Sequence, residues 1–242
     1  MVTLNKQNYF RLILPFINFV LMDKCAGLEF NLLEQNLVLL PQKAIFWHQE
    51  KALIVADVHL GKVGHFRKAG IAVPRDMEQD DLAVLSDLIA EYHPEKIYFL
   101  GDLFHSDMNT DWEWFVLWRK NFPKLEIILI KGNHDIIHDK HYLQLDVKLH
   151  KSLKVGPFLM LHHPIDSVQQ LMVDGYVLCG HIHPGVSLAG RARQHLTLPC
   201  FAFGEKQAIL PSFGRFTGRV AIRDQKTDRI FAVLKDKIMA IA

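Results

Sequence analysis

Ile127-Ile-Leu-Ile-Lys-Gly-Asn-His-Asp135 is the segment of this 242-residue chain from which we infer the architecture. Its β-branched apolar run breaks at a glycine, which predicts a buried strand that ends in a loop at the edge of a sheet. Gly132 can adopt the backbone conformation that exposes the next three side chains. These offer an amide oxygen, an imidazole and a carboxylate, which suit a metal site. The alternative is an ordinary loop in which Asp135 caps a helix that starts at Ile136.

Four further apolar runs end in the same kind of polar residue, which favours the metal-site interpretation. They are Ala52–Ala56 before Asp57 and His59, Ile97–Leu100 before Asp102 and His105, Phe158–Leu161 before His162 and His163, and Tyr176–Cys179 before His181 and His183. In α/β sheets, functional sites lie outside the carboxyl ends of the strands. We therefore expect these side chains to meet at one edge of the fold.

The segments between these strands predict helices and a second sheet. A helix opens at Pro74-Arg75-Asp76 and carries an apolar face, and another spans about 111–121 with an aromatic face that packs in the core. Strand–helix alternation predicts a largely parallel sheet in this half of the chain. Short runs in 28–49 predict strands at its edge. After His183, short apolar runs separated by glycine and proline predict antiparallel strands.

Composition indicates one domain and excludes few classes of function. Half of the residues are apolar, and the net charge of +2 is too small to indicate nucleic-acid binding by itself. We expect a single domain over 28–242 after an N-terminal leader of uncertain role over 1–27. The 14 histidines exceed what packing requires and suit metal or proton chemistry.

The cysteines and the leader bear on cellular location. Cys25, Cys179 and Cys200 are odd in number and widely spaced, which indicates reduced thiols in a cytoplasmic protein. No apolar run approaches the roughly 18 residues of a membrane span. Leu12–Met22 resembles a weak signal peptide, but it contains Pro15 and no small-residue cleavage site follows it. Met22 offers an alternative start.

The polar residues at the strand ends combine hard oxygen with borderline nitrogen donors. The set is Asp57, His59, Asp102, Asn133, a histidine of the pair 162–163, His181 and His183. Such a set suits two ions of manganese, iron or zinc better than calcium or magnesium, with manganese expected. Two ions about 3.5–4 Å apart can share a carboxylate and a hydroxide that attacks phosphorus. The implied reaction is phosphate-ester hydrolysis.

These motifs resemble the calcineurin-like metallophosphoesterase superfamily between about Ala56 and Pro184. The resemblance implies a four-layer αββα sandwich. It assigns Asp57, His59 and His183 to one metal and Asn133, His162 and His181 to the other, with Asp102 bridging. His162 is chosen over His163 because the family's usual ligand stands two residues before a proline. The resemblance also gives His134 a general-acid role at the scissile phosphate.

Within the superfamily, the chain resembles the ligase-associated DNA damage response endonucleases, the PdeM family. The resemblance rests on Ala56–Lys62, Phe66–Gly70, Gly101-Asp-Leu-Phe-His105 and the tail Leu210-Pro-Ser-Phe-Gly-Arg-Phe-Thr-Gly218. It implies a DNA substrate and association with a DNA ligase, a helicase and another nuclease in DNA repair. His105 would help to orient the DNA phosphate.

Four cations are candidates for contacts with backbone phosphates: Lys62, Arg67, Arg191 and Arg193. For the last two, a solvated surface position is favoured. Two other functions remain open. One is a phosphodiesterase for a small or cyclic nucleotide, and the other is a low-activity scaffold in a repair assembly. An open groove rimmed by Lys62 and Arg67 would favour DNA, and an enclosed pocket would favour a mononucleotide.

Overall fold

The computed structural model describes residues 27–62, 80–105, 108, 110–189, 195–215, 217–222 and 229–241. Several sequence predictions fall outside these residues. They are the leader, the helix start at Pro74–Asp76, Cys25, and the cations Arg67, Arg191 and Arg193.

The first sheet has seven strands in chain order. They are β1 (Leu28–Leu32), β2 (Gln35–Leu40), β3 (Ala44–Trp47), β4 (Ala52–Val55), β5 (Lys96–Phe99), β6 (Glu126–Ile130) and β7 (Val147–His150). The strands β1 to β4 pair antiparallel, and β4 to β7 pair parallel. The predicted edge strands and the predicted parallel half are both confirmed.

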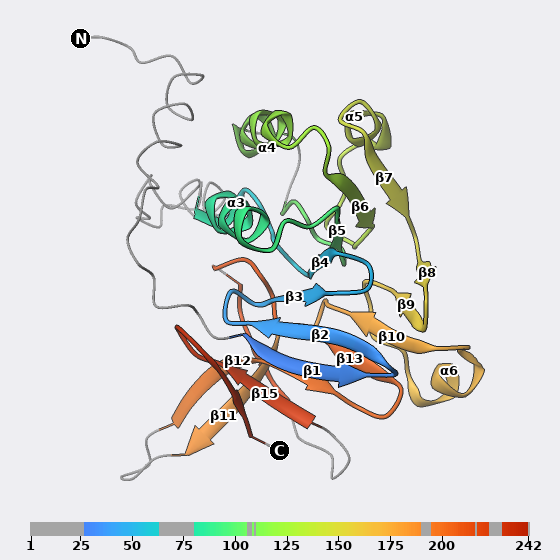
Figure 1. Ribbon diagram of the computed structural model, residues 1–242, viewed down its shortest axis with the longest axis vertical. Coiled ribbons are helices and arrows are strands. Elements are labelled where there is room, and N and C mark those ends of the chain that lie inside the picture. The colour runs from blue at the N-terminus through green and yellow to red at the C-terminus, as the bar shows by residue number, and fades with distance from the viewer. Residues whose placement is uncertain are drawn as a thin grey trace.

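Three helices cover one face of the first sheet (Figure 1): α3 (Asp80–Tyr92), α4 (Thr110–Asn121) and α5 (Asp139–Leu143). Alternate strand residues face these helices. In β5, Ile97 and Phe99 pack on this side, whereas Tyr98 belongs to the core on the opposite side. The predicted apolar face of α3 is buried, and Trp118 of α4 is fully enclosed. Each such aliphatic or aromatic side chain contributes roughly 1.5–3 kcal/mol when it leaves water.

The second sheet is built from the later part of the chain. Its strands are β8 (Leu153–Val155), β9 (Phe158–Met160), β10 (Tyr176–Cys179), β11 (Pro184–Ala189), β12 (His195–Phe203), β13 (Gln207–Ile209), β14 (Val220–Ala221), β15 (Arg229–Val233) and β16 (Ile238–Ala240). The strands β8 and β9, β11 to β13, and β12, β15 and β16 pair antiparallel. Three pairs are parallel: β9 with β10, β10 with β13 and β11 with β14. The antiparallel prediction is therefore right for the principal pairs after His183.

The two sheets pack face to face over an aromatic and aliphatic core (Figure 1). Phe30 of β1 contacts Phe203 and Phe231 of the second sheet, with ring centroids 4.4 and 5.2 Å apart. The short helix α6 (Ser167–Met172) flanks the second sheet. Two packed sheets flanked by helices confirm the predicted α/β sandwich, with α3, α4 and α5 forming the helical layer on the first sheet.

The packing of the two sheets brings the carboxyl ends of β4, β5 and β6 near those of β9 and β10. His162, after β9, places Nδ1 2.9 Å from Leu100 O after β5 and Nε2 3.1 Å from Asn133 Oδ1 after β6. His181 N–H, after β10, donates to Asp57 Oδ2, after β4, over 2.8 Å. Among the described helices, none is long and apolar enough to cross a membrane. Cys179 and Cys200 are buried free thiols.

Candidate metal centre

The loops after β4 and β5 are joined by backbone hydrogen bonds. Asp57 N–H donates to Gly101 O over 3.2 Å, and His59 N–H donates to Asp102 O over 2.8 Å. Farther along, His105 N–H donates to Leu60 O over 2.9 Å. These bonds hold the polar residues of the two loops in one fixed arrangement.

Asp57, His59 and His183 form one group of candidate ligands. His183 Nε2 lies 3.4 Å from His59 Nε2 and 3.6 Å from Asp57 Oδ1. Asp57 is fully buried, and its Oδ1 has no hydrogen-bond partner, whereas Oδ2 accepts from His181 N–H over 2.8 Å. A buried carboxylate oxygen without a donor is costly in a folded protein. A cation between Asp57 and the two imidazoles would satisfy it.

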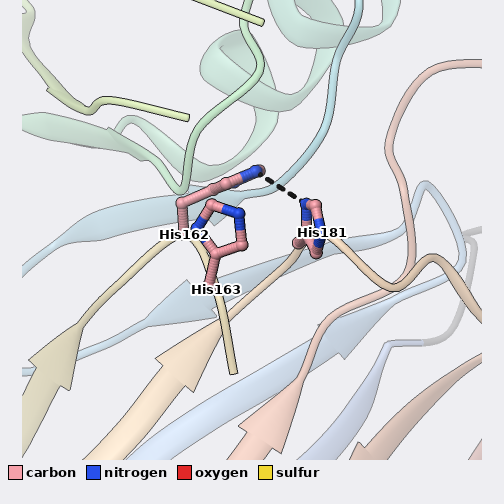
Figure 2. A group of neighbouring side chains, drawn as sticks. All are labelled: His162, His163 and His181. Carbon is pink, nitrogen blue, oxygen red and sulfur yellow. Dashed lines mark hydrogen bonds between the residues drawn. The ribbon is translucent and has the colours of Figure 1, made fainter. Parts of the chain in front are cut away.

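His162 joins a second group with Asn133 and His181. His162 Nε2 is 3.1 Å from Asn133 Oδ1 and 3.2 Å from His181 Nδ1, and Figure 2 shows the His162 and His181 rings pointing toward each other. His162 Nδ1 lies 2.9 Å from Leu100 O. Because a carbonyl only accepts, Nδ1 carries the proton and Nε2 is left to bind a metal.

Asp102 lies between the two groups. Its Oδ2 is 3.7 Å from His59 Nε2 and 3.5 Å from His162 Nε2, and it is buried. The other oxygen, Oδ1, accepts the backbone N–H of His134 over 2.9 Å. One oxygen is thus fixed by the protein, and the other faces both groups.

The spacing and protonation of these donors fit a pair of divalent ions. Ligands about 2.1 Å from one ion lie roughly 3.0–3.4 Å apart, and the closest donor pairs are 3.1, 3.2 and 3.4 Å apart. Burial is the main cause that lowers the pKa of His59 to about 2, and it also lowers the pKa of His181. Both imidazoles are therefore neutral, which is the form that binds metal.

The backbone at the site is unusual. Five of the seven predicted ligands have left-handed φ angles between 50° and 71°: Asp57, His59, Asp102, His181 and His183. Aspartate and histidine tolerate this region better than most residues, yet such conformations still carry strain and cluster at functional sites. Gly101 also has a positive φ, of 84°, and it leaves room for a ligand: a Cβ at this position would lie 2.1 Å from His162 Nδ1.

His163 belongs to a group of candidate ligands that contains only histidines and no carboxylate. It forms a cluster with His162 and His181, and its ring centroid is 4.1 Å from that of His181 (Figure 2). Its side chain is exposed, whereas His162 is buried and lies near both Asp57 and Asp102. The geometry therefore favours His162 as the ligand of the pair.

The two predicted catalytic histidines lie beside the ligands. His134 and His105 stack with ring centroids 5.3 Å apart, and both rings are steeply inclined to that of His59, at 73° and 70°, respectively. His105 Nδ1 is 3.4 Å from His59 Nδ1. His105 thus contacts the side of His59 that does not face the other ligands, a contact the sequence did not predict.

Lys62, predicted to bind substrate, lies within electrostatic reach of the site. Burial lowers the pKa of its ammonium group, while the carboxylates of Asp102 and Asp57 raise it. Its predicted companion Arg67 lies outside the described residues.

Asp135 has a role that sequence reasoning missed. The alternative in which Asp135 caps a helix from Ile136 is not observed, because α5 begins at Asp139 with His138 as its N-cap. Instead, the buried Asp135 carboxylate accepts four backbone N–H groups, from Asp102, Leu103, Phe104 and Gly132, at 2.8–3.3 Å. Gly132 allows this close approach, since a Cβ there would lie 2.2 Å from Asp102 Oδ1. Burial raises the pKa of Asp135 to about 6, against the opposing effect of these donors.

We expect Asp135→Asn to destabilise the protein by about 2–4 kcal/mol, because the amide NH2 would face backbone donors and leave some of them unsatisfied. The β5 loop would also lose its anchor, so metal affinity should fall. Denaturant unfolding and metal titration measure the two effects. The exposed Asp236, between β15 and β16, provides a matched control as Asp236→Asn. Equal unfolding free energies for the two variants would contradict this role.

Comparisons with known proteins agree with this geometry. The family model described as calcineurin-like phosphoesterase matches residues 51–190. The crystal structure of Pseudomonas putida nuclease MPE is 31% identical, with a TM-score of 0.74, and the match covers 89% of this chain and 100% of that chain. The Escherichia coli phosphoesterase Yfce is 12% identical with a TM-score of 0.41, covering 79% and 98% of the two chains, a likeness too weak to bear on function. No curated protein matches the chain.

Proposed function

The chain belongs to the calcineurin-like phosphoesterase family, and we propose that it is a two-metal phosphodiesterase that cleaves DNA. The observation that carries the proposal is the position of Asp102 Oδ2, 3.7 Å from His59 Nε2 and 3.5 Å from His162 Nε2, between two sets of donors. A carboxylate has the charge and the lone pairs to hold two cations that otherwise repel.

In this proposal each metal has its own ligands and both share Asp102. Asp57, His59 and His183 would hold one ion, and Asn133, His162 and His181 would hold the other. When bound, two manganese ions, or iron or zinc, supply a nucleophile by lowering the pKa of water and neutralise charge on the phosphoryl oxygens. The protein's contribution is to fix the donors before substrate arrives.

His134 is proposed as the general acid. Its ring stacks on His105, and its backbone N–H is tied to Asp102 Oδ1, so the side chain is held beside the proposed shared ligand. It is absent from the metal-ligand groups in the described residues. An imidazole so placed can protonate the oxygen of the leaving group.

Support for DNA as the substrate comes from two sources. The Pseudomonas putida nuclease is 31% identical over 89% of this chain, and the motif Gly101-Asp-Leu-Phe-His105 resembles a nuclease branch of the family. His105 would orient the phosphate, with Lys62 and Arg67 contacting the strand. The same resemblance supports a cytoplasmic repair role beside a DNA ligase, a helicase and a second nuclease.

A substrate panel combined with His105→Ala tests this proposal. We expect the manganese-loaded parent to hydrolyse single-stranded DNA, duplex DNA or both, and to hydrolyse cyclic nucleotides poorly. If His105 orients the phosphate, His105→Ala should slow DNA cleavage more than hydrolysis of a small bis-aryl diester, which has few remote contacts. Both metals should remain bound.

Metal content distinguishes a role of His105 in orienting the phosphate from a role in supporting His59. Since His105 Nδ1 is 3.4 Å from His59 Nδ1, a residue that only supports His59 would lower metal content when removed and slow both substrates alike. Efficient hydrolysis of cyclic nucleotides without cleavage of DNA would contradict the nuclease assignment. A rate of DNA cleavage equal to that of the parent would contradict the role of His105.

A further inference from the structure

The tail motif of the sequence is built into the proposed metal centre. We use the name tail loop for residues 210–215 and 217–220, which follow β13. Ser212 Oγ donates to Asp57 O over 2.8 Å, and Gly214 N–H donates to the same oxygen over 3.1 Å. Phe213 N–H donates to Ala56 O over 2.8 Å. The loop is thus fastened to the backbone at the end of β4.

The other end of the tail loop holds His183. His183 Nδ1 lies 3.2 Å from Gly218 O, and Val220 N–H donates to His183 O over 3.1 Å. Because the Gly218 carbonyl only accepts, it places the proton on Nδ1 and directs Nε2 toward His59 and Asp57. These bonds therefore fix the backbone at both ends of the tail loop relative to the first group of candidate ligands.

The tail loop also carries positive charge. Arg215 and Arg219 are exposed, and Lys43, from the turn between β2 and β3, donates from Nζ to Gly214 O over 3.2 Å. Burial is the main cause that lowers the pKa of Lys43 to about 8. Asp81 opposes the shift, while Arg219 and Arg215 add to it. Lys43 is thus close enough to Arg215 and Arg219 for their charges to lower its pKa.

Two of the three cations, Lys43 and Arg219, make hydrogen bonds to backbone carbonyls. Lys43 binds the loop carbonyl, and Arg219 Nη1 donates to Thr197 O over 3.3 Å. Neither of these two contacts supplies a negative charge, whereas Asp81 lies near enough to Lys43 to raise its pKa. A concentration of like charge beside a site for phosphate chemistry attracts anions and is relieved by them.

We propose that Arg215 and Arg219 bind backbone phosphates of a nucleic-acid strand that leaves the metal centre on the side of His183, with Lys43 strengthening the positive field. The inference rests on the proposed function, because it takes the strand's scissile phosphate to lie at Asp102. The contacts are sequence-independent and fix the register of the strand over the metals.

The test compares Arg215→Gln/Arg219→Gln with the parent in the manganese-loaded, full-length protein. The probe is a fluorescein-labelled single-stranded 20-mer with phosphorothioate linkages, and its Kd is followed by anisotropy across a series of salt concentrations. We expect binding at low salt to weaken at least about tenfold. The slope of log K against log salt should become shallower by about 1.4, since each phosphate contact on a single strand contributes about 0.7.

Two control variants make the result specific. Lys120→Gln/Lys124→Gln removes the same charge from exposed positions that precede β6, at the edge of the sheet opposite the site. It should leave the slope within the error of the parent. Arg215→Lys/Arg219→Lys keeps the charge and should recover most of the binding, which excludes misfolding as the cause.

The outcomes separate this inference from the proposed function. If Arg215→Gln/Arg219→Gln binds like the Lys120/Lys124 variant, the tail loop does not contact the strand, whatever the parent cleaves. If binding falls as expected but the parent cleaves no DNA, the result supports phosphate binding by Arg215 and Arg219 and contradicts the nuclease assignment. Failure of the lysine variant to recover binding would also overturn the inference, because charge would not be the operative property.

Discussion

Asp102→Asn should lower the metal content from two ions per chain to one or none and reduce turnover by about 10³-fold. The asparagine keeps the size of the side chain and tolerates the left-handed φ of 50° at this position. It removes the charge that is proposed to hold two cations together, and metal-ion stabilisation of the transition state is worth several kcal/mol. The measurements are elemental analysis of dialysed protein and hydrolysis of a bis-aryl phosphodiester.

The matched control for this change is Asp139→Asn. Asp139 is exposed and forms an ion pair with Lys131 at the surface, so its variant should keep both ions and the parental rate. Two ions bound to Asp102→Asn with unchanged turnover would show that the bridging assignment is wrong.

His134→Ala should keep both metals and lose the chemical step, with kcat falling by about 10²- to 10⁴-fold on DNA. A group that acts in the transition state without binding metal lowers kcat more than it disturbs binding. The size of the loss should depend on the leaving group. A phenolate leaves without much protonation, whereas a deoxyribose oxygen requires it, so the defect should be smaller on an aryl diester.

Steady-state kinetics on both substrates, together with metal content, test the role of His134. The exposed His48 supplies a control that removes an imidazole outside the site, as His48→Ala. Equal defects of His134→Ala on DNA and on the aryl diester would indicate that the ring only positions the phosphate. Loss of metal from this variant would indicate that it is a ligand or supports one.

The fold and the identity of the clustered residues follow from the sequence for a simple reason. Parallel strands place their carboxyl ends at one edge, so polar residues that follow β4, β5 and β6 must meet. The apolar runs at Phe158 and Tyr176 carry the same signal, although their strands belong to the second sheet. Packing of the two sheets then brings His162 and His181 to Asp102.

Other features of the site depend on contacts between residues far apart in the chain. The motif Gly-Asn-His-Asp does not indicate that the Asp135 carboxylate accepts hydrogen bonds from the backbone N–H groups of the loop after β5. Likewise, no spacing indicates that Gly218 fixes the ring of His183. The sequence distinguishes His162 from His163 only through the family resemblance, because the two adjacent residues carry the same side chain; the structure adds that His162 is buried beside two carboxylates and His163 is exposed.

The measurement that tests the central proposal most directly is the rate of bis-aryl phosphodiester hydrolysis by chelator-treated protein as manganese is added back. A two-metal phosphodiesterase should show no hydrolysis without metal and a rise in rate that reaches its plateau at two ions per chain. Hydrolysis at the full rate after chelation, or none at saturating manganese, would contradict a two-metal phosphodiesterase.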